Sequence, residues 1–210
     1  MIHERWRDAN RAIREFFDQR AAQWDDCVCA EHGERLAGIV AALSIARGAR
    51  VLDVGTGTGV LLPILAEAVG RDGGLVALDI SFKMLVEVHA RDYPGRIACL
   101  QGDTLALPVA DGVFDWIVCN SCFPHFHDQE RALGELSRTL SPEGRLVICH
   151  TQSRDAINAM HREVGDVVGG HELPDAATLH TFLAGAGLRA ESYDDREERY
   201  LVVARRAVPH

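Results

Sequence analysis

Short runs of apolar residues alternate along the chain with segments whose apolar positions recur every three or four residues. The runs predict strands at 50–54, 75–79, 96–100, 114–119 and 145–150. The spaced patterns predict helices at 60–69, at 82–91 with Ser81 as its N-cap, and from the cap Asp128 to Leu140. Continuously apolar strands separated by helices are typical of a parallel sheet with helices on both faces. The middle of the chain therefore predicts a doubly wound α/β fold.

The two ends of the chain depart from this alternation of strands and helices. Two helices are predicted before the first strand, at 4–24 and 35–46. After residue 174, a helix to about residue 186 precedes strands at 188–193 and 200–205, which a short acidic turn joins into an antiparallel hairpin. We expect one domain over 1–210, with a helical cap at 1–47, a core at 48–150 and a substrate-side segment with the hairpin at 151–210.

A glycine-rich loop joins the first core strand to the next helix. Gly55, Gly57 and Gly59 let the backbone turn tightly and let a ligand approach the main chain. Their G-x-G-x-G spacing differs from the G-x-G-x-x-G fingerprint of dinucleotide-binding proteins. A glycine loop in this place is typical of a nucleotide site, although many such loops are only tight turns.

Two aspartates follow the next strands at the same edge. Asp79 ends the second strand, where a carboxylate can accept hydrogen bonds from both hydroxyls of a ribose. Asp103 follows the third strand, where its carboxylate can accept a bond from an adenine amino group. A helix-capping or surface acid is the alternative for Asp79, and a plain turn residue is the alternative for Asp103.

These segments together resemble the class I S-adenosylmethionine-dependent methyltransferases. Residues 51–59 (VLDVGTGTG) are similar to the first family motif, 78–79 to the second, and 102–103 with 114–115 to the adenine loop and fourth strand. Residues 131–146 are similar to the helix, turn and strand that follow. The resemblance covers about residues 48–150 and is nearest to the small-molecule branch that includes the quinone-biosynthesis methyltransferases. The turn Ser-Pro-Glu-Gly at 141–144 departs from the usual Lys-Pro-Gly-Gly.

The resemblance implies a mostly parallel seven-stranded sheet with an antiparallel C-terminal strand, and S-adenosylmethionine as the cofactor. The glycines would border its methionine part, Asp53 would meet its amino group, and Asn120 would lie near the reactive methyl. Ile80 would pack on the adenine and Thr104 beside it. The residues expected to bind the cofactor are Asp53, Gly55, Thr56, Gly57, Gly59, Asp79, Ile80, Asp103, Thr104 and Asn120.

Several of the ten histidines gather at the same predicted edge. His125, His127 and His150 are the candidates for a general base toward a hydroxyl or phenol, and His161 and His171 lie in the segment before the last helix. A metal site is the second interpretation, but the spacings match no zinc signature, so no metal is expected. Ordinary hydrogen-bonding histidines are the third.

The six cysteines are too sparse for a disulfide scaffold and are expected as reduced thiols. Cys99, Cys119 and Cys149 end apolar runs, where cysteine usually behaves as a small buried hydrophobe. Cys27 and Cys29, with Cys122 at the rim, suggest binding of a thiophilic substrate such as a metalloid. Unremarkable free thiols are the alternative.

Composition narrows the choice of partners. A net charge of −9 over 210 residues disfavours nucleic acid as a partner, and 47% hydrophobic residues exclude wholesale disorder. No apolar stretch has the length of a membrane helix and the polar N-terminus lacks a signal sequence, so a cytoplasmic protein acting on a small-molecule methyl acceptor is expected. Apolar residues of the cap either pack internally or form a homodimer contact. The alternatives are a nicotinamide-dependent oxidoreductase and a cofactor- or metal-binding module without turnover.

Overall fold

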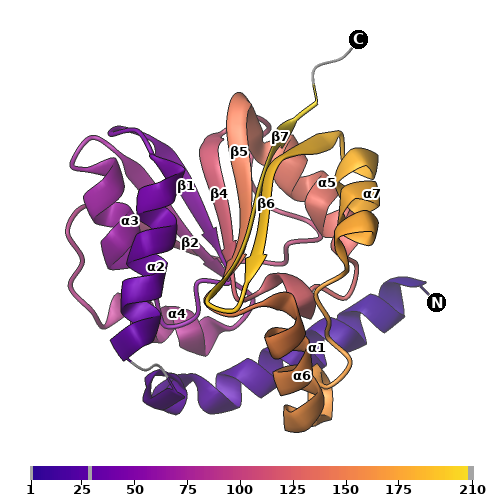
Figure 1. Cartoon of the computed structure of the whole chain (residues 1–210). Coiled ribbons are helices and arrows are strands. Elements are labelled where there is room, and N and C mark those ends of the chain that lie inside the picture. Colours follow the sequence, from indigo (N-terminus) through magenta and orange to yellow (C-terminus); the bar gives the residue numbers. More distant parts are fainter. Residues whose placement is uncertain (1, 28–29, 208–210) are drawn as a thin grey trace.

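A computed structural model describes residues 2–27 and 30–207. In this part of the chain a single sheet has seven strands in the order β3-β2-β1-β4-β5-β7-β6 (Figure 1). Its neighbouring strands are parallel except where β7 pairs with β5 and β6. The strands are β1 Arg50–Val54, β2 Gly74–Asp79, β3 Ile97–Gln101, β4 Phe114–Asn120, β5 Leu140–His150, β6 Leu188–Arg196 and β7 Arg199–Arg206. The predicted fold class is confirmed.

Helices cover both faces of this sheet. The α-helices are α1 Ile2–Arg20, α2 Ala30–Leu43, α3 Leu62–Val69, α4 Phe82–His89, α5 Gln129–Thr139, α6 Arg154–Val164 and α7 Ala176–Gly185. Short 3-10 helices occur at η1 Ala21–Cys27, η2 Phe123–His125 and η3 Asp166–Val168. One apolar cluster joins α2 and α3 to the sheet, and another joins α5 and α7 to the opposite face. α1 and α6 lie across the end of the sheet where the parallel strands finish (Figure 1).

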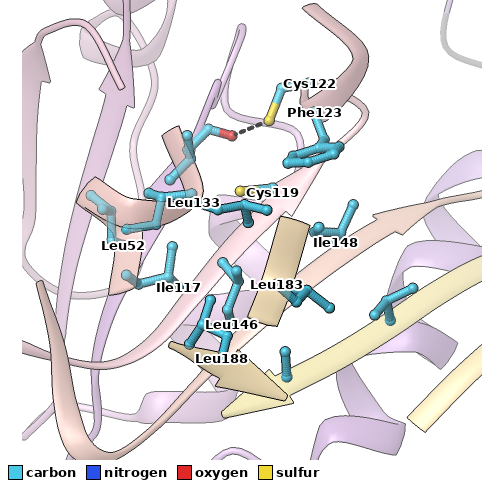
Figure 2. Packing of buried hydrophobic residues seen from close by; sticks show 14 of the residues in the cluster. Leu52, Ile117, Cys119, Cys122, Phe123, Leu133, Leu146, Ile148, Leu183 and Leu188 are labelled. Carbon is cyan, nitrogen blue, oxygen red and sulfur yellow. Dashed lines mark hydrogen bonds between the residues drawn. The ribbon is translucent and has the colours of Figure 1, made fainter. Parts of the chain in front are cut away.

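Alternate side chains of each central strand enter opposite clusters. Leu52 and Ile117 pack toward α5 and α7, whereas Val51 and Val118 pack toward α2 and α3. This two-sided burial explains why the strands read as continuously apolar. Figure 2 shows the first cluster, in which Leu133 of α5 lies against the strands.

The predicted elements of the core are present with small shifts at their ends. Ser81, Asp128 and Asp175 cap α4, α5 and α7, each side chain accepting a hydrogen bond from a backbone N–H of the first turn. β5 begins at Leu140, so the turn predicted at 141–144 lies inside a strand. It forms an irregularity there, because Phe114 pairs with Leu140 while Trp116 pairs with Arg145.

The main omission is α6, which the sequence pattern did not lead us to predict. Its first turn carries a signal, since the Ser153 hydroxyl accepts a hydrogen bond from the Ala156 N–H. Its buried face holds Ile157 and His161, which are four residues apart. The first predicted helix is also shorter than expected, because it ends at Arg20 and continues as η1.

No helix in the described residues is long and apolar enough to cross a membrane. The free thiols of Cys119, Cys122 and Cys149 are buried. Cys99 is exposed, contrary to expectation, because its strand β3 lies at the edge of the sheet.

The buried cluster predicts a stability difference between two helical residues. Leu133→Ala should lower the free energy of unfolding by about 2–5 kcal/mol, because it leaves a cavity in a fully buried site. Val86→Ala on the exposed face of α4 is the control and should change the free energy by less than about 0.5 kcal/mol. Urea denaturation measures both, and equal effects would contradict the described packing.

Candidate functional site

The carboxyl ends of the central parallel strands open into a cavity of about 720 Å³. Its walls come from the loops after β1, β2, β3, β4 and β5, and α1, η1, α2 and α6 complete them. Open α/β sheets bind ligands at this edge, where the strand order reverses beside the first strand. The cavity therefore lies where the sequence predicted a site.

The glycine loop after β1 has the backbone conformation that its sequence predicts. Gly55, Gly57 and Gly59 have φ values of +62°, +56° and +86°, which residues other than glycine rarely adopt. A Cβ on Gly55 would lie 2.5 Å from the Cβ of Cys122. Gly57 has no such neighbour and lines the cavity. The loop thus presents bare backbone to a ligand.

Asp79 ties this loop to the end of β2. Its Oδ2 accepts a hydrogen bond from the Gly57 N–H at 2.8 Å, and its Oδ1 accepts one from the Ser81 N–H at 2.8 Å. Asp79 is 7% exposed and lines the cavity. Burial raises the pKa of Asp79 to about 6, against the lowering effect of the two backbone bonds.

Asp53 lies beneath the loop and is also buried. Its Oδ2 accepts a hydrogen bond from the Thr56 hydroxyl at 2.6 Å. Burial raises the pKa of Asp53 to about 7, and the neighbouring charge of Asp79 adds to this rise. Two carboxyl groups whose charged forms are poorly solvated therefore lie close to the glycine loop, and of the two only Asp79 lines the cavity.

The other residues predicted for the cofactor also lie on the cavity wall, with the exception of Asp53 and Gly59. Asp103 accepts hydrogen bonds from the Leu105 N–H and from the Asn10 side-chain amide. Ile80 packs against the small apolar cluster of α1 and η3. The lining includes Gly55, Thr56, Gly57, Asp79, Ile80, Asp103, Thr104 and Asn120.

The cap is attached to the rim by polar contacts that sequence analysis missed. Asp18 of α1 accepts a hydrogen bond from the Ser81 hydroxyl, and Asp25 of η1 accepts one from the Thr58 hydroxyl at 2.6 Å. Asp25 also forms an ion pair with Arg91. Contacts more than thirty residues apart in the chain leave no local pattern from which they could be found.

Three histidines, His125, His161 and His171, lie close together, and the first two of them line the cavity. The Nδ1 atoms of His125 and His171 are 3.1 Å apart, and the rings of His125 and His161 are 4.9 Å apart between centroids. The His161 Nδ1 lies 2.6 Å from the backbone carbonyl oxygen of His171. The sequence predicted that several histidines gather at this edge of the sheet. In the structure α6 carries His161 to His125 and His171.

The remaining two candidates differ from each other. His150 is buried at the end of β5, and neither ring nitrogen has a hydrogen-bond partner among the described residues. Burial lowers the pKa of His150 to about 3. The pKa of His127 is lowered by burial, against the raising effect of the charges of Asp103 and Asp128.

Neither a metal site nor a thiol site is formed by the residues that the structure describes. Within 2–27 and 30–207, no group of three or more histidine, cysteine or acidic side chains is arranged to hold a metal ion. The Cys122 thiol donates a hydrogen bond to the Val54 carbonyl at 3.0 Å, and its pKa is raised by burial (Figure 2). Cys29 and the Cys27 side chain lie outside the described residues.

Comparison with known proteins finds relatives of the core. Residues 52–148 match the profile of a methyltransferase domain family. The demethylmenaquinone methyltransferase of Thermus thermophilus is 43% identical over 105 residues, which are 47% of this chain and 46% of the relative. The 2-phytyl-1,4-naphtoquinone methyltransferase of Thermosynechococcus vestitus is 39% identical over 107 residues, 50% of this chain and 48% of the relative. This chain thus spans about half the length of these curated relatives.

A solved structure supports the fold over more of the chain. A SAM-dependent methyltransferase from Aquifex aeolicus superposes with a TM-score of 0.70 at 23% identity, covering 89% of this chain and 97% of that one. Residues 52–148 thus match a methyltransferase domain and are similar to quinone-biosynthesis methyltransferases, and the chain shares the fold of a SAM-dependent methyltransferase.

Proposed function

We propose that the protein transfers a methyl group from S-adenosylmethionine to a small-molecule nucleophile. The observation that carries the proposal is Asp79, a buried carboxylate held by the N–H groups of Gly57 and Ser81 at the cavity wall. Each carboxylate oxygen has a second lone pair for a ribose hydroxyl. The family match of residues 52–148 supports the same reaction.

The residues present fit this cofactor chemically. The positive φ of Gly57 and the absence of a Cβ leave room for the cofactor's methionine part. Asp53 and Asp79 would supply negative charge next to its ammonium group and hydrogen-bond acceptors to its hydroxyls. Asp103 would receive the adenine amino group, Ile80 and Thr104 would pack on the ring, and Asn120 would lie near the methyl.

The cofactor supplies the leaving group, a neutral thioether, when the methyl is transferred in line. The protein's residues then have to align the acceptor and exclude water. The cap contributes to both, because Asp18 and Asp25 hold α1 and η1 on the rim. On the acceptor side, His125, His127 and His150 are proposed to contact the substrate, and apolar Met160 and Val164 of α6 line the cavity.

Two alternatives lead to different experimental outcomes. A nicotinamide-dependent enzyme would bind NAD, whereas the glycine spacing and the antiparallel β6–β7 hairpin favour an adenosyl sulfonium cofactor. A binding module without turnover would bind S-adenosylhomocysteine and transfer no methyl group to any acceptor. Calorimetric titration with S-adenosylhomocysteine and with NAD separates the first alternative from the proposal.

Replacing Asp79 should remove cofactor binding without unfolding the domain. Asp79→Ala should weaken S-adenosylhomocysteine binding at least about 100-fold, because two hydrogen bonds to a charged group are lost, each worth about 1.5–3 kcal/mol. Asp72→Ala, at an exposed turn before β2, is the control and should bind as the wild type does. Calorimetry measures the affinity and circular dichroism checks the fold. An unchanged affinity in Asp79→Ala would overturn the ribose assignment.

The buried carboxyls also predict a pH dependence. Their pKa values in the folded protein, about 7 for Asp53 and about 6 for Asp79, exceed the ordinary value, so the folded state holds more protons than the unfolded state between about pH 4 and 7. Ligand-free stability contributed by these groups therefore falls as pH rises through that window. Affinity for S-adenosylhomocysteine should rise over the same range, because the charged carboxylates are the better acceptors.

Differential scanning fluorimetry from pH 5 to 8 measures this effect. The increase in melting temperature on adding S-adenosylhomocysteine should grow with pH. Asp53→Asn, which keeps an acceptor for the Thr56 hydroxyl, should flatten the pH slope of the ligand-free protein. A ligand-induced increase that stays constant from pH 5 to 8 would contradict the buried-carboxylate description.

A further inference from the structure

The orientation of His161 settles which of its ring nitrogens carries a proton. Its Nδ1 lies 2.6 Å from the backbone carbonyl oxygen of His171, and a carbonyl can only accept a hydrogen bond. The neutral His161 ring must therefore carry its proton on Nδ1, and its Nε2 holds a bare lone pair. The ring is buried and lines the cavity.

The His171 carbonyl is itself held in place by the loop that precedes α7. The His171 N–H donates to the Val168 carbonyl at 2.9 Å, which closes a turn after η3. Two residues further on, the Leu173 N–H and carbonyl pair with the Asn158 side chain of α6 at 2.8 and 3.1 Å. The helix that carries His161 and the carbonyl that orients its ring are therefore attached to each other.

The neighbouring histidines are less suited to take a proton. His125 and His171 share one hydrogen bond through their Nδ1 atoms, so one ring must donate to the other. His150 has no partner for either nitrogen to stabilise a charged ring. Burial lowers the pKa of all three, and the charge of His161 lowers them further. These three rings are therefore poorer proton acceptors than histidines in water.

We propose that His161 is the group that accepts the proton of the methyl acceptor, and that the acceptor is an O–H compound of the phenol or enol class. The inference rests on the proposed methyl transfer and extends it. A base is useful only where the nucleophile is protonated at neutral pH, as phenols and enols are. The Cys122 thiol at the cavity wall is turned to the Val54 carbonyl, which disfavours a thiophilic substrate.

The proposed step balances in charge. The acceptor's O–H bond breaks and its proton goes to the His161 Nε2, which makes an imidazolium whose Nδ1–H still donates to the His171 carbonyl. The electron pair left on oxygen, or on the carbon conjugated with it, forms the new bond to the methyl carbon. The carbon–sulfur bond breaks and its electron pair stays on sulfur. The positive charge passes from the sulfonium to the imidazolium, which later loses its proton to water.

Nitrogen NMR of the full chain with ¹⁵N-labelled histidine tests the ring orientation directly. Long-range proton–nitrogen correlations distinguish protonated from bare ring nitrogens. At pH 8, with and without S-adenosylhomocysteine, the His161 ring is expected with a protonated Nδ1 and a bare Nε2. The ring signals of His161 are assigned by their absence from the spectrum of His161→Gln. If that variant does not fold, through-bond correlations within the wild-type side chain assign them. A protonated Nε2, or an equal mixture of both forms, would overturn the proposal.

The proton transfer is tested with 4-nitrophenol, whose ionised form absorbs visible light. Bound to the protein loaded with S-adenosylhomocysteine, it should be more ionised than free 4-nitrophenol at the same pH. His161→Gln should lower the ratio of ionised to neutral bound probe at least about tenfold, which is one pKa unit. His180→Gln, at an exposed position of α7 outside the cavity, is the control and should leave the ratio unchanged.

The outcomes separate this inference from the function on which it rests. If S-adenosylhomocysteine does not bind, the proposed function fails, and the NMR of the ligand-free protein still decides the orientation of His161. If it binds and the probe is equally ionised in wild type and His161→Gln, the role of His161 is overturned. If the loaded wild type does not bind the probe, the O–H class of acceptor is overturned.

Discussion

The hydrogen bonds from the Gly57 and Ser81 N–H groups to the Asp79 carboxylate are the interaction on which the site depends. They join the ends of β1 and β2, which the sheet already places side by side in parallel register. They also hold the glycine loop in a backbone conformation with positive φ. Because one carboxylate meets both N–H groups, the loop and the start of α4 are oriented together, and the cavity wall between them is continuous.

This arrangement places buried charge at the carboxyl edge of the sheet. The raised pKa values of Asp53 and Asp79 show that burial outweighs the hydrogen bonds that each carboxylate receives. Apolar clusters on both faces of the sheet oppose this cost by stabilising the fold. A cationic ligand with hydroxyl donors would relieve it, so the same residues that weaken the ligand-free protein would favour binding of a sulfonium cofactor.

The sequence predicted most of the core, and most of the residues predicted to bind the cofactor line the cavity. Continuous apolar strands, glycines with positive φ and capping residues such as Ser81 are local signals, and each was present where expected. The contacts of Asp18 and Asp25 with the rim join distant parts of the chain, and no spacing reveals them. The sequence of α6 contains a capping serine and an apolar face. Its apolar residues alternate with many charged ones, so its helical pattern is weaker than that of the core helices.

Burial shifts the pKa values of the acidic and the basic groups around the cavity in opposite directions. Where the cofactor is proposed to bind, burial raises the pKa of Asp53 and Asp79, and where the methyl acceptor is proposed to bind, it lowers the pKa of His125, His150 and His171. Both shifts favour neutral groups in the ligand-free protein, as expected where water is scarce. A methyl transfer moves positive charge from the cofactor side to the acceptor side. The carboxylates would hold that charge before transfer, and a histidine oriented by a backbone carbonyl would hold it afterwards, so the division of the cavity matches the direction of the proposed reaction.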